Sequence, residues 1–138
     1  MKVLPLSSQN KAELACWLAG DEWLIACLCA GWCDLCGTYR ETFAALAERH
    51  PDKHFVWIDI EDQAELVGDM DVENFPTLLI QRAELVVFFG EILPDLVVAD
   101  RLLTSLAKVD LATAQAEVQA SATKRGWQSE NNLRKALR

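Results

Sequence analysis

The stretch Trp32-Cys33-Asp34-Leu35-Cys36 says more about the fold of this chain than any other segment. It directly follows the apolar run 23–30 and directly precedes a strongly helical stretch. Unpaired amides at a helix N-terminus create a partial positive charge that stabilises a thiolate, the reactive form of cysteine. Cys33 is therefore the candidate nucleophile. Cys36, one helical turn further on, can attack a mixed disulfide formed on Cys33.

Cysteine pairs with this spacing also occur in zinc ribbons and haem attachment sites. This chain has no second such pair and no histidine directly after Cys36. Cys27 and Cys29 would lie on one face of a strand, so a metal or iron–sulfur site with the motif cysteines is an alternative. Their apolar neighbours favour a packing role instead, and we interpret Cys16 as a core residue for the same reason. We expect redox use, no metal and no cofactor.

Composition limits the class of protein before any motif is considered. A chain of 138 residues predicts one domain, and 51% apolar residues can fill a core without a disulfide framework. We see no apolar run long enough for a signal peptide or a membrane span, so a cytoplasmic protein is expected. The net charge of −8 disfavours nucleic acid and anionic membranes as partners.

Hydrophobic periodicity predicts an alternation of strands and helices. The expected strands span residues 1–4, 23–30, 54–60, 78–81 and 85–89. The expected helices begin at Ser7 or Ser8, at the motif, near Asp62 and near Asp95. The motif helix should end at His50-Pro51, because proline disfavours helical geometry in the residue before it. His50 and His54 have no ligand partner at a suitable spacing and are expected to be solvated.

This order of elements resembles the thioredoxin family over roughly residues 2–108. Trp32-Cys33-x-x-Cys36 is similar to the family's active-site motif. Phe75-Pro76-Thr77 resembles its loop with a cis-proline opposite the cysteines, and Gly90 falls where a glycine follows the last strand. The resemblance implies an α/β fold, a three-layer α/β/α sandwich with a central mixed sheet. Residues 1–108 would form this domain and residues 109–138 a helical C-terminal extension.

The resemblance also implies a function. The chain would be a thiol–disulfide oxidoreductase that reduces or exchanges protein disulfides through Cys33 and Cys36, with electrons supplied by a reductase system. Trp32 would shield the site, while Phe75 and Pro76 would contact the extended peptide of the substrate. The alternatives are a non-catalytic thioredoxin-like binding or assembly module and, less favoured, a metal or iron–sulfur carrier.

The chain departs from the family pattern at positions that tune the site. Asp34-Leu35 replaces the usual Gly-Pro between the cysteines, and Glu41 replaces a helix-kinking proline. Cys27 stands where the family buries an acid, and Trp57 stands where a lysine often accompanies that acid. The loss of both charges together makes physical sense, because either charge alone would be buried without a partner at a high cost in free energy. Without the acid, proton removal from Cys36 should rely on water or another group and be slow.

Charge patterning suggests two further features. Asp34 disfavours a thiolate on Cys33, so a reducing couple is expected. An acidic rim precedes the proline loop and would favour partners with basic surfaces, although a merely solvated face is the simpler interpretation. Its members are Glu61, Asp62, Glu65, Asp69, Asp71 and Glu73.

The C-terminal extension differs in charge from the rest of the chain. Five basic residues and Glu130 give residues 124–138 a charge of +4, which leaves −12 on the first 123 residues. Only a weak helical stripe runs through residues 111–118, so a helix there needs a partner surface. Three arrangements remain open: packing on its own body, contact with a second copy to form a homodimer, and a mobile tail.

Overall fold

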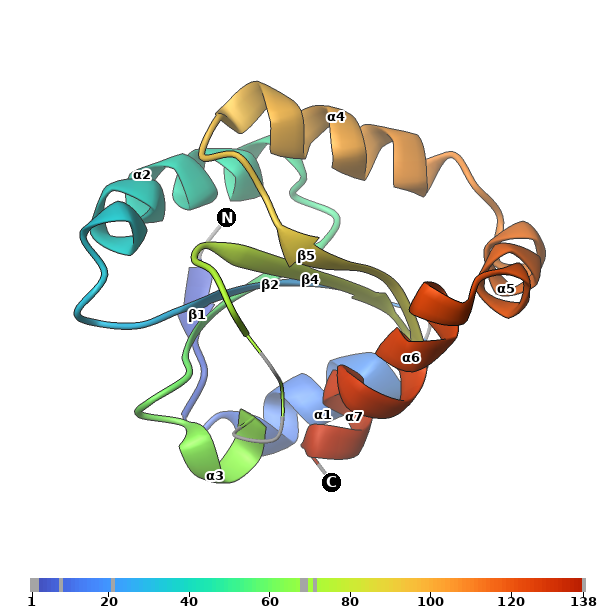
Figure 1. Ribbon diagram of the computed structural model, residues 1–138, viewed down its shortest axis with the longest axis horizontal. Coiled ribbons are helices and arrows are strands. Elements are labelled where there is room, and N and C mark those ends of the chain that lie inside the picture. The colour runs from blue at the N-terminus through green and yellow to red at the C-terminus, as the bar shows by residue number, and fades with distance from the viewer. Residues whose placement is uncertain (1–2, 8, 21, 68–69, 71, 138) are drawn as a thin grey trace.

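The computed structural model describes residues 3–7, 9–20, 22–67, 70 and 72–137, and a five-stranded mixed sheet lies at its centre (Figure 1). The strands are β1 (Val3–Pro5), β2 (Trp23–Cys29), β3 (His54–Asp59), β4 (Thr77–Arg82) and β5 (Leu85–Glu91). Their order in the sheet is β1-β3-β2-β4-β5. Strands β1, β3 and β2 run parallel, and β4 is antiparallel to both β2 and β5.

Helices cover both faces of this sheet. They are α1 (Lys11–Ala19), α2 (Asp34–Arg49), α3 (Ala64–Val67), α4 (Leu96–Ala107), α5 (Leu111–Ala120), α6 (Ala122–Glu130) and α7 (Leu133–Ala136). Figure 1 shows α2 and α4 on one face, α1, α3, α6 and α7 on the other, and α5 beyond one end of the sheet. The expected three-layer sandwich with C-terminal helices is therefore confirmed. Within the described ranges, no helix is long and apolar enough to cross a membrane.

Strand β2 is buried on both faces, which explains its uninterrupted apolar sequence. Successive strand side chains point to opposite faces. Ile25, Cys27 and Cys29 belong to the core beneath α2 and α4, and Leu24 and Leu28 belong to the core beneath α1 and α7. The strand after which the cysteine motif begins is thus fixed from both sides.

Helix α2 begins and ends where the sequence predicts. Cys33 is its N-cap residue and His50 its C-cap residue, directly before Pro51. Tyr39, Phe43 and other apolar residues at helical spacing are buried against the sheet. The packing of α2 on the sheet sets how the motif cysteines lie over the end of β2.

The C-terminal extension packs on the body of its own chain, which is the first of the three open arrangements. The Gln128 side chain accepts from the Val86 amide (2.8 Å) and donates to the Val86 carbonyl (2.7 Å), so it pairs free backbone groups of β5. Leu133 and Leu137 are buried in the core that α1 also covers. Arg134 adds an ion pair to Glu84 at 2.7 Å.

Buried amides complete this docking. Gln81, fully buried on β4, donates to the Asn132 side chain (2.7 Å) and accepts from the Leu133 amide (2.8 Å). The Asn132 side chain in turn donates to the Glu84 carbonyl at 2.9 Å. Buried polar groups are costly unless they are bonded, so these contacts fix one position for the extension.

Two predictions for the region of α1 are wrong. Cys16 is exposed, because the buried side of α1 is formed by Leu14 and Leu18. The N-cap of α1 is Asn10 and not Ser7, and the Asn10 side chain closes the preceding turn by accepting from the Ser7 amide at 2.8 Å. Ser8, the other expected cap, lies outside the described residues.

The prediction of solvated histidines is wrong for His50, while His54 is half-buried and keeps part of its ring exposed. His50 is buried, and its Nε2 lies 2.7 Å from a carboxylate oxygen of Asp100 on α4. His54 stacks on Trp17 with 3.9 Å between ring centroids and lies 2.9 Å from a carboxylate oxygen of Glu22. Both acidic partners are distant in sequence, so local spacing could not indicate them.

Candidate active site

Cys33 lies at the point where the chain leaves β2 and enters α2. Its backbone is extended, its amide donates to the Ala30 carbonyl (3.0 Å), and its carbonyl accepts from the Gly37 amide (3.3 Å). The side chain is half-buried and carries a free thiol. The thiol of this N-cap residue lies next to the unpaired amides of the first turn of α2 and is partly accessible from outside. Asp34 is exposed in the same turn and places a negative charge beside the partial positive charge of these amides.

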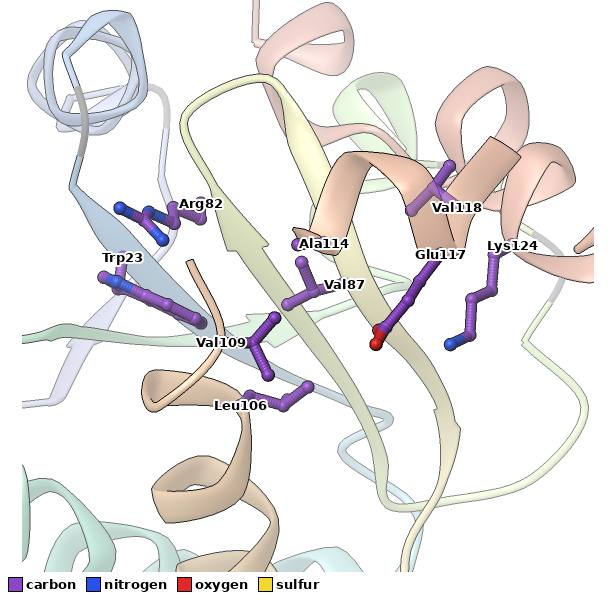
Figure 2. A pocket seen from close by; sticks show the side chains of 9 residues that line it. All are labelled: Trp23, Arg82, Val87, Leu106, Val109, Ala114, Glu117, Val118 and Lys124. Atoms are coloured by element: carbon purple, nitrogen blue, oxygen red, sulfur yellow. The ribbon is translucent and has the colours of Figure 1, made fainter. Parts of the chain in front are cut away.

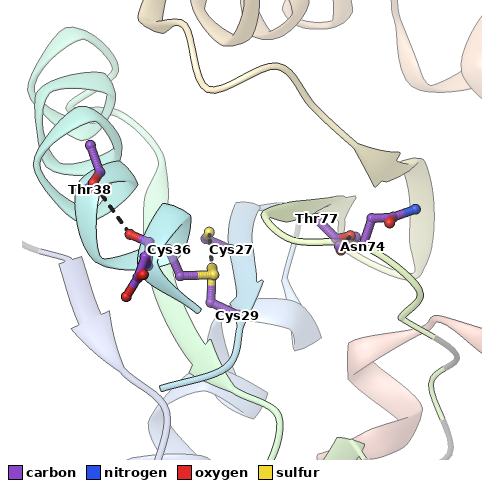
Figure 3. The surroundings of a disulfide bond; sticks show 7 residues. Cys27, Cys29, Cys36, Thr38, Asn74 and Thr77 are labelled. Carbon is purple, nitrogen blue, oxygen red and sulfur yellow. Dashed lines mark hydrogen bonds between the residues drawn. A yellow bond between two sulfur atoms is a disulfide. The ribbon is translucent and has the colours of Figure 1, made fainter. Parts of the chain in front are cut away.

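Cys36 lies one turn into α2 and points down to the sheet. It is buried and forms a disulfide with Cys29, the last residue of β2, with 5.8 Å between their Cα atoms (Figure 3). The sequence predicted core packing for Cys29 and a redox pair of Cys33 with Cys36. The structure instead joins Cys36 to Cys29 and leaves Cys33 free. The alternation of side chains along β2 was the available signal for this pairing, because it puts the side chain of Cys29 on the face that α2 covers, shortly before the motif.

Cys27 extends the row of sulfurs into the core. It is fully buried, with its Sγ 3.7 Å from the Sγ of Cys29. Because Cys29 is disulfide-bonded, only the Cys27 S–H can donate in this contact. Burial raises the pKa of the Cys27 thiol well above its ordinary value, and the positive charge of Arg40, the smaller effect, lowers it. Cys27 is therefore a neutral thiol and cannot accept a proton as a buried carboxylate would.

An aromatic group surrounds these sulfurs on the α2 side. Trp57 is buried on β3, with the guanidinium of Arg40 4.9 Å from its ring centroid and Phe43 edge-on at 5.9 Å. Tyr39 is buried beside them, and its hydroxyl has no hydrogen-bond partner among the described residues. Burial first, and then the nearby Cys27, raises the pKa of Tyr39. The local sequence pattern gave no signal for this buried hydroxyl.

The metal alternative can be tested on the geometry of the described part of the chain. There, no group of three or more histidine, cysteine, aspartate or glutamate side chains is arranged to hold a metal ion.

An apolar rim, formed by Trp32, Leu35 and Phe75, lies at the motif: Trp32 and Leu35 stand on either side of Cys33 in the chain, and Phe75 packs against Trp32. Trp32 is 67% exposed, and its ring meets Phe75 edge-on with 5.6 Å between centroids. Leu35 is 42% exposed although it belongs to the first turn of α2. Exposed aromatic and aliphatic side chains gathered in this way are typical of protein-binding surfaces.

The peptide bond between Phe75 and Pro76 is cis, as the sequence predicts. The carbonyl of Pro76 accepts from the Ile92 amide at 3.3 Å, and Thr77 donates to the Asn74 carbonyl at 2.6 Å, so the loop is held on both sides. Leu93, the residue after Ile92, is 69% exposed. The sequence did not indicate Leu93 as an exposed apolar residue, because no helix or strand was predicted between the last strand and α4.

Asp59 is a second residue for which sequence reasoning predicted no role. It pairs with Cys29 across the sheet, and its carboxylate accepts from the amides of Glu61 (2.9 Å) and Asp62 (3.2 Å). A Cβ on Gly31 would lie 3.2 Å from the same carboxylate, which would have to shift by a few tenths of an ångström to make room for it. Asp59 thereby holds the turn that carries Glu61 and Asp62, close to Gly31 of the β2–α2 loop.

The turn after β3 places part of the acidic rim at the cysteine end of the sheet. The Ile60 amide donates to the Cys29 carbonyl at 2.9 Å, which holds this turn beside the end of β2. Glu61 and Asp62 follow directly and are exposed. Glu73 is exposed in the segment before the cis-proline loop. Asp69 and Asp71 lie outside the described residues.

A small cavity lies at the opposite end of β2 (Figure 2). Its walls combine Trp23 with Val87 of β5, Val118 of α5, and Val109 of the connection between α4 and α5. Trp23 is the first residue of β2 and Cys29 the last, which separates the cavity from the cysteines by about 20 Å. The cavity therefore takes no part in the cysteine site.

Comparisons with known proteins agree with this fold. The family model described as Thioredoxin matches residues 8–89. Putative thioredoxin 2 of Streptomyces coelicolor is 31% identical over 106 residues, which cover 74% of this chain and 78% of that protein. The chain belongs to the thioredoxin family.

Solved structures show the same fold. A mutant thioredoxin of Halobacterium salinarum matches with a TM-score of 0.66 and 23% identity, covering 79% of this chain and 94% of that one. A complex of ferredoxin:thioredoxin reductase with thioredoxin f2 matches with a TM-score of 0.60 and 18% identity, covering 77% and 93%.

Proposed function

We propose that this protein is a thiol–disulfide oxidoreductase that reduces or exchanges disulfides of other proteins through Cys33 and Cys36. The observation that carries the proposal is the free, half-buried thiol of Cys33 at the N-cap of α2, beside the apolar rim. Membership of the thioredoxin family supports the same chemistry.

The reaction needs two steps. The Cys33 thiolate attacks one sulfur of the substrate disulfide, and the other substrate sulfur leaves and takes up a proton. Cys36, in its reduced form, then attacks the Cys33 sulfur of the mixed disulfide and releases the second substrate thiol. The substrate gains two electrons, and the protein is left with a Cys33–Cys36 disulfide.

The apolar rim and the cis-proline loop form the substrate surface in this proposal. An extended peptide would lie along Phe75 and Pro76, with Trp32 covering the reacting sulfurs. The carboxylates of Glu61, Asp62 and Glu73 would favour substrates with basic residues around their disulfide.

The resolving step should be slow near neutral pH, because Cys27 occupies the position of a proton acceptor and is itself a neutral thiol. Electrons would come from a reductase, and one structural relative is a thioredoxin in complex with ferredoxin:thioredoxin reductase. An exposed thiol at Cys16 suits a reducing compartment, and we place the protein in the cytoplasm.

The test is reduction of a generic protein disulfide by dithiothreitol, with and without the protein. Cys33→Ser should abolish the catalysed rate. Cys16→Ser removes an exposed thiol from α1, on the opposite face of the sheet from α2, and should leave the rate unchanged. Equal rates for Cys33→Ser and the unaltered protein would reject the proposed activity and favour a non-catalytic binding module.

A further inference from the structure

Four cysteines form a row from the surface into the core. Cys33 is half-buried at the N-cap of α2, and Cys36 is buried one turn further on. Cys29 is joined to Cys36, and the sulfur of Cys27 lies 3.7 Å beyond the sulfur of Cys29. Figure 3 shows the last three of these side chains meeting between α2 and β2. Cys36 therefore has one cysteine on its solvent side and another on its core side.

We propose that Cys29 is a third redox-active cysteine, which takes the disulfide over from the Cys33–Cys36 pair and stores it in the core. This inference rests on the proposed function, because turnover supplies the Cys33–Cys36 disulfide. The oxidised resting form then contains a Cys29–Cys36 disulfide and a free Cys33 thiol, the arrangement that the structure displays.

The exchange balances within the protein. The Cys29 sulfur attacks the Cys36 sulfur, the bond between Cys33 and Cys36 breaks, and Cys33 leaves as a thiolate. The proton lost by Cys29 is matched by the proton that Cys33 takes up through solvent. One disulfide is consumed and one is formed, so no oxidant is needed beyond the substrate disulfide of the preceding turnover.

The fold brings the partners together without moving an element. Cys29 ends β2 with its side chain under the first turn of α2, and 5.8 Å separates its Cα from that of Cys36. The Cys36 sulfur can exchange partners by side-chain motion, since Cys33 lies one turn away on the same helix end.

Cys27 has a positioning role in this exchange. Its sulfur lies 3.7 Å from the Cys29 sulfur, so its S–H can donate to the thiolate that forms on Cys29 when the Cys29–Cys36 bond, called here the inner disulfide, opens. A buried thiolate without a donor would be costly in this apolar core. Cys27 should therefore speed opening of the inner disulfide without forming a bond itself.

Storage changes what the protein can do. While Cys36 is bonded to Cys29, Cys33 keeps its nucleophilic thiol but has no resolving partner. A substrate captured on Cys33 in this form stays attached until a reductant opens the inner disulfide. The stored form should bind substrates covalently instead of turning them over.

The experiment maps disulfides in the full chain after oxidation by one equivalent of a protein disulfide. Free thiols are alkylated under native conditions, and the digested peptides are identified by mass spectrometry. We expect the Cys29–Cys36 peptide pair to exceed the Cys33–Cys36 pair by about tenfold or more, with Cys33 alkylated; tenfold corresponds to about 1.4 kcal/mol. A predominant Cys33–Cys36 disulfide would overturn the inference.

Two variants make the mapping specific. Cys29→Ala should retain catalysed disulfide reduction, form only the Cys33–Cys36 disulfide and lose alkylation of Cys33 after oxidation. Cys27→Ala is the matched control, because it removes a neighbouring buried thiol from the same face of β2. It should keep the Cys29–Cys36 disulfide and slow its reduction by dithiothreitol.

The two proposals fail in different ways. A protein that reduces substrates through Cys33 but never forms the inner disulfide rejects only the storage role of Cys29. Loss of the inner disulfide in the Cys27 control would also reject that role, because the pairing would then depend on general core packing. An inactive protein that still forms the inner disulfide with dissolved oxidant rejects the proposed turnover, and with it the source of the stored disulfide.

Discussion

Asp100 on α4 contacts Arg49 and His50 at the end of α2, and we call this group of three residues the clamp between α2 and α4. The clamp is expected to contribute a measurable, pH-dependent part of the free energy of unfolding. Asp100 on α4 accepts from Arg49 at 3.1 Å and lies 2.7 Å from the His50 ring nitrogen. The His50 side chain is 11% exposed, so its bond to a carboxylate is worth roughly 1.5–3 kcal/mol. The Arg49 side chain is 51% exposed, and its ion pair adds about 0.5 kcal/mol or less. Asp100→Asn should therefore lower the free energy of unfolding by about 2 kcal/mol at pH 7.

The pH dependence of this contribution follows from the direction in which the pKa of Asp100 is shifted. The hydrogen bond to His50, and then that to Arg49, lowers the pKa of Asp100 below its ordinary value. The carboxylate stabilises the fold above the pKa of the unfolded chain, and this contribution is lost as pH falls through the lowered pKa of the folded state. The difference between Asp100→Asn and the unaltered protein should shrink from pH 7 towards pH 3.

Urea unfolding followed by tryptophan fluorescence in reducing buffer measures this difference. Glu48→Gln removes an exposed carboxylate from the last turn of α2 and serves as the control, with a change within about 0.5 kcal/mol. An Asp100→Asn variant as stable as the control at pH 7 would refute the clamp. A difference that stayed constant down to pH 3 would refute its ionic origin.

Three further changes test other parts of the structure. Cys27→Asp should speed release of mixed disulfides near neutral pH by supplying a proton acceptor and should lower stability; a slower or unchanged resolving rate in a folded variant would contradict this. Leu133→Ala should cost about 2–5 kcal/mol, because this fully buried side chain anchors the extension; a loss below about 1 kcal/mol in urea unfolding would show that the extension contributes little. Ala83 has a φ of 53° in the β4–β5 turn, so Ala83→Gly should raise the unfolding free energy by up to about 1 kcal/mol, and a decrease would contradict the argument.

The sequence was sufficient to predict the sheet, the main helices and the position of the motif. The apolar run of β2, the helical spacing in α2 and the stop before Pro51 are local signals, and they predicted element bounds within about two residues. The thioredoxin-like order of elements then predicted the cis-proline loop, because Phe75-Pro76-Thr77 stands directly before the strand where the family has that loop.

Features that depend on distant contacts could not be predicted. The Cys29–Cys36 pairing requires the position of α2 over β2, and local pattern predicted only that Cys29 was apolar core. Gln128 reaches Val86 across 42 residues of sequence, so the docking of the extension left no local signal. His50 was misjudged for the same reason, since its carboxylate partner lies 50 residues away.

The central claim, that Cys33 is the nucleophile of a thiol–disulfide oxidoreductase, is tested most directly by trapping. Cys36→Ala removes the resolving thiol, so a mixed disulfide between Cys33 and a substrate protein should accumulate. Mass spectrometry of the adduct should locate the bond at Cys33. No adduct should form in the double variant that carries both Cys33→Ser and Cys36→Ala. Equal trapping by the variant that lacks both residues, or an adduct only at Cys16, would contradict the account.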